Sequence, residues 1–233
     1  LELKEGIPED LSTMIVVPTL LPDEKRVGEL LENLEMHYLS NKEKNLFFTL
    51  LGDFKDSSES NMDNDEKIIN AAMEGIKRLN EKYAKDGQDI FYFFHRRRIF
   101  NKNENKWMGW ERKRGAIIEF NDLLLGSKET SFSYFSNENF PSGRIKYVIT
   151  LDADTILPIG AAKKMIGTME HPLNRPVIDK NRGIVVEGYG LVQPRISFDI
   201  ESSNKSLFSR IFTGQEGIDP YASAISDVYQ DLF

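Results

Sequence analysis

The chain has 233 residues, with 30 Lys and Arg, 37 Asp and Glu, 3 His and no Cys, and its formal net charge is −7. This length fits one large domain or two small ones. The acidic balance argues against a nucleic-acid partner held through a broad phosphate-contacting surface. The lack of Cys excludes disulfides, thiolate zinc sites and a Cys nucleophile, so a bound metal would be a hard cation on carboxylates.

Short apolar runs that alternate with amphipathic runs predict strands and helices in turn. Strands are predicted at 14–18, 46–51, 90–94, 147–151 and 183–193, and helices at about 27–38, 69–83, 112–125 and 159–170. This order predicts an α/β fold with a doubly wound, mainly parallel sheet and helices on both faces. We expect all five strands to form one sheet, with residues 147–151 away from its edges.

A pair of carboxylates follows the fourth predicted strand. Asp152 and Asp154 come directly after the run YVITL, and their spacing would place both side chains on one side of an extended segment. Ligands of such sheets bind outside the carboxyl ends of the strands. Because magnesium prefers one or two carboxylates together with substrate phosphates, the pair predicts a divalent-metal site for a diphosphate. The plainer alternative is a surface turn after a strand.

Two other predicted strand ends carry candidate contacts to a nucleotide. The first strand runs into Thr19, and the second runs into Gly52 and Asp53. We hypothesise that Thr19 and Asp53 face a nucleotide and that Asp53 accepts hydrogen bonds from its base. The alternative is that these are ordinary turn residues.

The segment 107–115 is dense in cations and aromatic residues. Lys113 and Arg114 lie at the start of a predicted helix, where free backbone N–H groups already favour anions. The segment therefore predicts a pyrophosphate site, and the alternative is a solvated basic face. The other basic run, His95–Arg98, is interpreted as a strand end at the surface. Gln193 and Arg195, after the fifth predicted strand, are candidates for contact with a sugar acceptor.

Several strings in chain order make the sequence resemble a known family. Four of these strings resemble inverting, processive glycosyltransferases of the glycosyltransferase-A fold. They are Met14–Thr19, Lys113–Ala116, Leu151–Thr155 with Leu157-Pro158, and Val192–Pro194. The strings Gly188–Arg195, Gly214–Tyr221 and Ser226–Phe233, with Trp110–Gly115, are similar to the glycosyltransferase domain of cyclic β-1,2-glucan synthases. The resemblance covers almost the whole chain.

The resemblance implies a function that composition does not give. The donor would be UDP-glucose, and Asp152 and Asp154 would hold Mg²⁺ or Mn²⁺, with Asp152 also near the ribose. A glucan acceptor would be extended into a β-1,2-linked product. The full-length parent would be a polytopic membrane protein with additional modules, acting on the cytoplasmic side of the inner membrane.

The family pattern continues beyond Phe233, so we expect one domain, residues 1–233, that is incomplete at its C-terminus. Its core would cover about 12–200, and 201–233 would be a partial acceptor-side segment. The family's general base, its Q-x-x-R-W-like motif and its membrane helices would lie outside this chain. Asp219 and Asp227 are the only local candidates for a base, and we expect donor binding with little or no sugar transfer.

Two alternatives stay open. Haloacid dehalogenase-type phosphatases also carry D-x-D-x-T/V at a strand end, but Ile156 breaks that pattern, and their strand usually opens the chain. A non-catalytic domain that binds nucleotide sugars would keep the fold and lose the metal chemistry. Binding of UDP with and without Mn²⁺ separates these alternatives.

Overall fold

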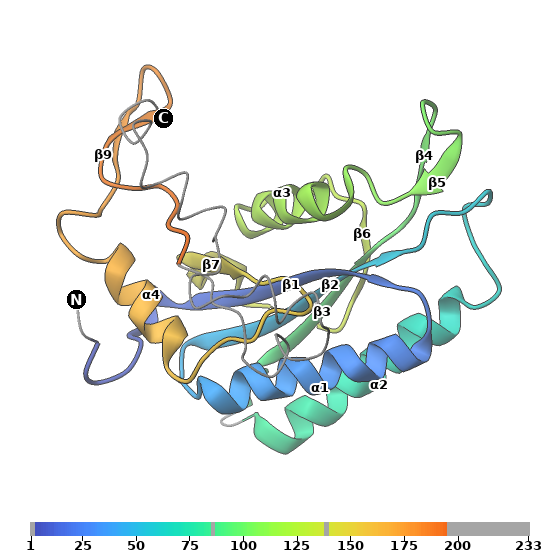
Figure 1. Ribbon diagram of the computed structural model, residues 1–233, viewed down its shortest axis with the longest axis horizontal. Coiled ribbons are helices and arrows are strands. Elements are labelled where there is room, and N and C mark those ends of the chain that lie inside the picture. Colours follow the sequence, from blue (N-terminus) through green and yellow to red (C-terminus); the bar gives the residue numbers. More distant parts are fainter. Residues whose placement is uncertain (1–2, 85–86, 138–139, 195–233) are drawn as a thin grey trace, which may run out of the picture. The chain divides into compact units, whose positions relative to one another are not determined.

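The computed structural model describes residues 3–84, 87–137 and 140–194 (Figure 1). Its contacts divide the chain into two compact units, Leu1–His171 and Pro172–Phe233. We describe each unit by itself. The expectation of a single domain over 1–233 stays a prediction.

The first unit contains a five-stranded sheet in the order β6-β3-β2-β1-β7. Its strands are β1 (Thr13–Leu21), β2 (Leu46–Phe54), β3 (Phe91–Arg96), β6 (Phe132–Phe135) and β7 (Tyr147–Thr150). Its helices are α1 (Glu24–Ser40), α2 (Asp65–Tyr83), α3 (Arg112–Leu124) and α4 (Ala161–Met169). Every neighbouring pair is parallel except β3 and β6. The predicted α/β fold with a mainly parallel sheet is confirmed, and it is compatible with a Rossmann-like glycosyltransferase fold.

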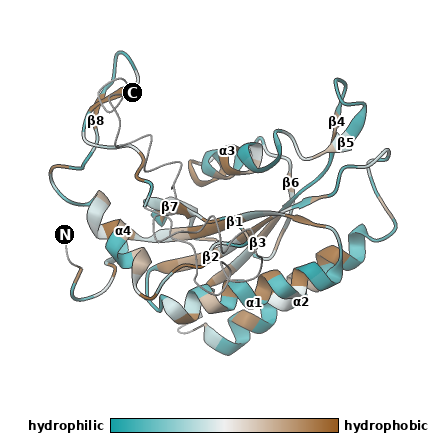
Figure 2. Cartoon of the chain, viewed as in Figure 1, coloured by the Kyte–Doolittle hydropathy of each residue, from teal (hydrophilic) through white to brown (hydrophobic). Residues whose placement is uncertain are grey.

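Helices cover both faces of the sheet, as predicted. Alternate residues of a strand point to opposite faces. In β3, Phe91 and Phe93 pack into the core shared with α1, α2 and α4, whereas Tyr92 and Phe94 pack on the side of Phe120 in α3. Figure 1 shows α1 and α2 below the sheet and α3 above it, and Figure 2 shows hydrophobic colour along the strands. The long aromatic and aliphatic runs of β2 and β3 are explained by this burial on both faces.

Two expectations about the strands are wrong. Within the predicted strand 183–193, only β9 (Ile184–Glu187) forms, and it pairs with β8 (Val177–Asp179) in a hairpin of the second unit. All four residues of β9 are exposed, and a partner close in sequence makes this local pairing easy to form. The fifth strand of the central sheet is instead β6, for which no strand was predicted.

The position of the fourth predicted strand also differs from expectation. β7 pairs with β1 through Thr13–Val16 and lies at the edge of the sheet within the described residues. Three of its four residues are half-buried and Thr150 is exposed. An apolar run does not distinguish a central strand from an edge strand that a helix or loop covers on one face.

Candidate functional site

The carboxyl ends of the parallel strands meet at one edge of the sheet. The register pairs Thr19 of β1 with Gly52 of β2, and Gly52 with His95 of β3, so these three residues lie side by side. Asp53 follows one step further along β2, and β7 ends two residues before Asp152. The edge therefore brings together Thr19, Asp53 and Asp152, as the sequence predicted for a ligand site of this fold class.

The two carboxylates after β7 lie in a turn. The backbone N–H of Thr155 donates to the carbonyl of Asp152 across 3.0 Å, so the extended segment expected here is wrong. Buried Leu151 anchors this turn to the sheet through a bond from its N–H to the carbonyl of Val16. Asp152 and Asp154 are both exposed, so solvent and ligands can reach them.

The start of α3 reaches the same edge. The Lys113 ammonium forms an ion pair with the Asp152 carboxylate, and both side chains are about half exposed. Arg114, the next residue, points elsewhere: its nearest carboxylate is that of Glu111, at 3.9 Å. The structure thus brings Lys113 to the carboxylate pair and does not bring Arg114 there.

The basic run after β3 is buried, so its interpretation as a surface strand end is wrong. His95, Arg96 and Arg98 are 0%, 1% and 7% exposed, and Arg97 alone of the four is exposed. Arg98 is buried because it forms an ion pair with Asp65 at the start of α2. Two of the four residues are therefore cations with partners of their own inside the protein.

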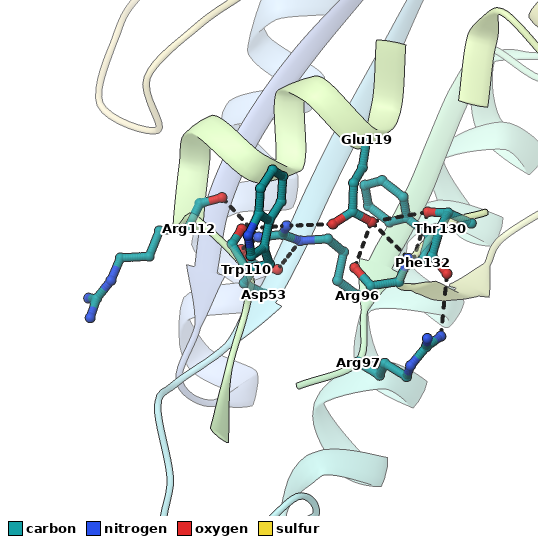
Figure 3. Close-up of polar contacts among 9 residues, drawn as sticks. Asp53, Arg96, Arg97, Trp110, Arg112, Glu119, Thr130 and Phe132 are labelled. Atoms are coloured by element: carbon teal, nitrogen blue, oxygen red, sulfur yellow. Dashed lines mark hydrogen bonds and ion pairs between the residues drawn. The ribbon is translucent and has the colours of Figure 1, made fainter. Parts of the chain in front are cut away.

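Arg96 lies at the centre of a buried polar cluster (Figure 3). Its Nε donates to Oδ1 of Asp53 at 2.7 Å, and its Nη2 donates to Oδ2 at 2.6 Å. Its Nη1 donates to Oε1 of Glu119 at 3.1 Å and to the carbonyl of Trp110 at 2.9 Å. Its Nη2 also donates to the carbonyl of Arg112 at 2.8 Å. All five N–H groups of the guanidinium therefore have acceptors.

One cation, Arg96, lies between two carboxylates, Asp53 and Glu119, below the surface. Burial would lower the pKa of Arg96, but the bonds to Asp53 and the nearby Glu119 outweigh it and raise the pKa. Burial would likewise raise the pKa of Glu119, yet bonds from the hydroxyl and N–H of Ser131, with Arg96, lower it. Burial raises the pKa of Asp53 against the opposing effect of Arg96.

Asp53 therefore lies where the sequence placed it along the strand, but not at the surface. It is 6% exposed, and both carboxylate oxygens are bonded to Arg96. Its predicted contact with a base stays a prediction. Thr19 is half-buried, and its hydroxyl donates to the carbonyl of Leu20 across a long 3.4 Å.

The turn that leads into α3 has an unusual backbone. Glu111 and Arg112 both have positive φ, 49° and 48°. Residues other than glycine rarely adopt this left-handed region, and each such residue costs of order 1 kcal/mol or more. Two in succession therefore need surrounding contacts that hold them in place.

Two glycines permit that turn to pack against the cluster. A Cβ on Gly109 would come within 2.7 Å of Nη2 of Arg96 and 2.8 Å of Oδ1 of Asp53. A Cβ on Gly115 would collide with the backbone carbonyl of Trp110. The glycine spacing in the segment 107–115 is thus a packing requirement of the Arg96 cluster.

The acceptor-side and base candidates lie outside the first unit. Gln193 is exposed and belongs to the second unit. Arg195, Asp219 and Asp227 lie outside the described residues. Their predicted roles stay predictions.

The carboxylate oxygens of Asp152 and Asp154 are ligands that suit a hard divalent cation. Within the described ranges, no group of three or more His, Asp or Glu side chains could hold a metal. Two exposed carboxylates are nevertheless the protein ligands that Mg²⁺ commonly uses when substrate phosphates complete its shell. Lys113 now neutralises one of them, so a metal there would compete with that ammonium.

The fold and this edge define a class: an α/β protein with a Rossmann-like sheet and polar residues at the carboxyl ends of its strands, the place where ligands bind in such sheets. The chain is 45% identical over 232 residues to cyclic beta-(1,2)-glucan synthase NdvB of Rhizobium meliloti (strain 1021). The matched region covers 99% of this chain and 8% of that relative's length. The resemblance to cyclic β-1,2-glucan synthases is therefore confirmed. No protein-family model matches the chain.

The similarity joins this chain to a small part of a much larger protein. In the part of the chain that the structure describes, no helix has the length and apolar character needed to cross a membrane.

Proposed function

We propose that this chain is the donor-binding part of a glucosyltransferase that uses UDP-glucose to build a β-1,2-linked glucan. The observation that carries the proposal is the 45% identity, over 99% of the chain, to a protein named as a cyclic β-1,2-glucan synthase. The polar edge at the carboxyl ends of β1, β2 and β7 supports it, because that edge is where this fold class binds nucleotides.

In this proposal the donor lies along that edge. Thr19 and Asp53 lie nearest the base, Asp152 near the ribose and Lys113 near the diphosphate. Asp152 and Asp154 would hold Mg²⁺ or Mn²⁺, which when bound would neutralise charge on the departing diphosphate. Lys113 pairs with Asp152 in the structure, so it is already within reach of that place and can turn to the phosphates.

The acceptor half of the reaction belongs to the whole protein. An inverting transfer needs a general base within hydrogen-bond reach of the attacking hydroxyl, and a carboxylate that holds a metal is a poor base. We place that base, the glucan channel and the membrane helices in the rest of the parent protein, on the cytoplasmic side of the inner membrane. The chain by itself should then bind donor and transfer little glucose.

Calorimetric titration of the 233-residue chain with UDP, with and without Mn²⁺, tests the proposal, and ADP serves as the matched control. We expect UDP to bind and ADP to bind more weakly. We expect Mn²⁺ to tighten the binding of UDP about tenfold or more, because Asp152 and Asp154 would hold the cation and it would neutralise charge on the diphosphate. Binding of UDP that is absent, or that Mn²⁺ does not change, contradicts the proposed donor site.

A second measurement tests whether this chain binds the donor without transferring glucose. The chain is incubated with UDP-glucose, Mn²⁺ and short β-1,2-glucan, and glucose incorporation is followed. Elongation at about 1 per second or faster, the ordinary range for enzymes, would show that a complete active site lies within these residues.

A further inference from the structure

The Arg96 guanidinium does more than neutralise Asp53. Two of its five hydrogen bonds go to the backbone carbonyls of Trp110 and Arg112, which flank Glu111 in the turn before α3. Those two carbonyls lie on either side of the first residue with positive φ, and Arg112 is the second. The Arg96 side chain is thus hydrogen-bonded to the strained part of the turn on both sides of Glu111.

The opposite side of the guanidinium is equally fixed. Asp53 on β2 takes two of its bonds, and Glu119, further along α3, takes another. Glu119 is itself held by the hydroxyl of Thr130 and by the hydroxyl and N–H of Ser131. The guanidinium of Arg96 therefore connects β3 to β2 and α3, and Glu119 extends the network to the segment before β6.

The consequence reaches the exposed edge through a single residue. Lys113 directly follows Arg112 and forms the ion pair with Asp152. If the turn relaxed to ordinary backbone angles, the first turn of α3 would shift and its Lys113 with it. A rigid planar cation with donors on two sides suits this task, whereas a flexible ammonium does not.

We propose that Arg96 is a positioning residue for the donor site: it holds the strained turn Trp110–Arg112, so that Lys113 and the N-terminus of α3 face Asp152. The inference rests on the proposed function only in naming UDP as the ligand. Arg96 itself is 1% exposed and contacts no ligand in this scheme. Its proposed effect on UDP binding is transmitted through the turn. Its partner Asp53 lies nearest the base in the proposed function, so weaker UDP binding in Arg96→Lys without faster exchange in 109–116 would assign the effect to Asp53 and refute the proposal.

Arg98 provides a matched control. It is buried, forms an ion pair with Asp65, and also donates to backbone carbonyls, those of Lys55 and Ser60. Those carbonyls belong to the loop between β2 and α2. That loop contacts the segment before α3 through the backbone pairing of Ser57 with Trp107 and the ion pair of Asp56 with the Arg112 side chain, but Arg98 itself donates to no carbonyl of the turn. Arg96→Lys and Arg98→Lys therefore both weaken a buried ion pair, but only the first removes hydrogen bonds to the carbonyls of the turn itself.

The first readout needs no ligand, so it is independent of the proposed function. Amide hydrogen exchange is followed in residues 109–116, with the core amides of β2 as the measure of global unfolding. In Arg96→Lys we expect exchange in 109–116 to rise about tenfold relative to wild type, beyond any change in β2. In Arg98→Lys we expect exchange in 109–116 to rise by about twofold or less relative to β2, because that loop contacts the turn only indirectly. Equal effects of the two variants would overturn the proposal.

A second pair of variants leaves the buried cluster intact, in case Arg96→Lys does not fold. Glu111→Gly and Glu111→Val remove the same exposed carboxylate, but glycine tolerates positive φ and a β-branched residue does not. Exchange in 109–116 should therefore be slower in the glycine variant than in the valine variant, by about tenfold. Equal rates would show that the turn holds no strain for Arg96 to restrain, and the proposal would fail.

The second readout is the affinity for UDP, measured by calorimetry well below the unfolding temperature. We expect about tenfold weaker binding in Arg96→Lys and a change within about twofold in Arg98→Lys. Faster exchange in 109–116 with unchanged UDP affinity would refute the link to the donor site. Absence of UDP binding in the wild type would refute the proposed function, while the exchange data would still decide whether Arg96 holds the turn.

Discussion

Two ion pairs at the same edge of the sheet differ in almost every respect except charge. In Arg96–Asp53 the side chains are 0% and 8% exposed, and in Lys113–Asp152 they are 47% and 60% exposed. The buried pair is bidentate and every guanidinium donor is satisfied, so neither partner can leave without stranding the other. The exposed pair is held by one ammonium in water, where such contacts contribute little and exchange easily. The buried Arg96–Asp53 pair therefore holds the edge in place, whereas a ligand can displace the exposed Lys113–Asp152 pair.

Removing the carboxylate of each pair should show the difference between the two pairs most directly. Asp53→Asn leaves Arg96 buried without its main counter-charge, and we expect a loss of about 3–5 kcal/mol in the free energy of unfolding. Asp152→Asn should change it by about 1 kcal/mol or less, because the partner remains in water. Urea denaturation of the two variants gives both values. Similar losses would mean that the two pairs do not differ as their burial indicates.

Acid should act on the buried part of this edge and spare the exposed part. His95 is fully buried next to Arg96, and burial lowers its pKa to about 3, because the imidazolium is poorly tolerated there. The unfolded chain binds this proton at about pH 6.5, so stability is complete above that pH and is lost as the pH falls towards the folded pKa. At about 1.4 kcal/mol per pH unit, the fall from pH 6.5 to 5 is about 2 kcal/mol.

A variant isolates this contribution from those of other groups. The His95 ring lies 4.0 Å from that of Phe54, and Phe93 and Tyr134 are close by, so His95→Phe should fit the site. The slope of unfolding free energy between pH 6.5 and 5 should flatten in this variant. Part of the slope will persist, because burial also lowers the pKa of His37. An unchanged slope would show that His95 is not the group that titrates.

The same contrast explains what could be predicted from the sequence. The apolar runs before Thr19, Asp53 and Asp152 predicted parallel strands, and the rule for ligands at strand ends brought the three residues to one edge correctly. The periodicity of apolar residues indicates which side chains are buried, so it predicted the sheet and the helices on both of its faces. Periodicity cannot indicate that a cation is buried with a partner, and His95–Arg98 was therefore wrongly placed at the surface.

The residues that sequence reasoning missed are those whose roles depend on partners far along the chain. Arg96 and Glu119 lie 43 and 66 positions from Asp53, and nothing local marks them as a cluster. One signal was present: Arg96 continues the alternation of Tyr92 and Phe94, which face α3. β6 was missed because it is only four residues long and pairs with β3, which is far along the chain, and such pairing leaves no periodic pattern in so short a segment.

On the exposed side of the comparison, Asp154 should matter for ligand and not for fold. Asp154→Asn removes one solvent-facing carboxylate while keeping its volume, so the unfolding free energy should stay within about 0.5 kcal/mol. We expect the Mn²⁺-dependent gain in UDP affinity to fall by about tenfold, since magnesium-type sites of this kind have only one or two protein carboxylates. Calorimetry with and without Mn²⁺ measures the gain. A full gain in the variant would exclude Asp154 from the metal site.

The smallest expected effects distinguish the two cations at the start of α3. Both lie on a helix N-terminus that favours anions, but Lys113 reaches Asp152 and Arg114 faces Glu111. Without metal, Lys113→Ala should weaken UDP binding by about threefold to tenfold, because one charge-assisted contact to the diphosphate is lost. Arg114→Ala should weaken it by about twofold or less. Removing Lys113 also frees Asp152, so the same variant should bind Mn²⁺ more tightly in the absence of UDP. A titration with Mn²⁺ alone decides this point: a weaker response in Lys113→Ala than in wild type would mean that Lys113 supports the carboxylate and does not compete with a metal for it.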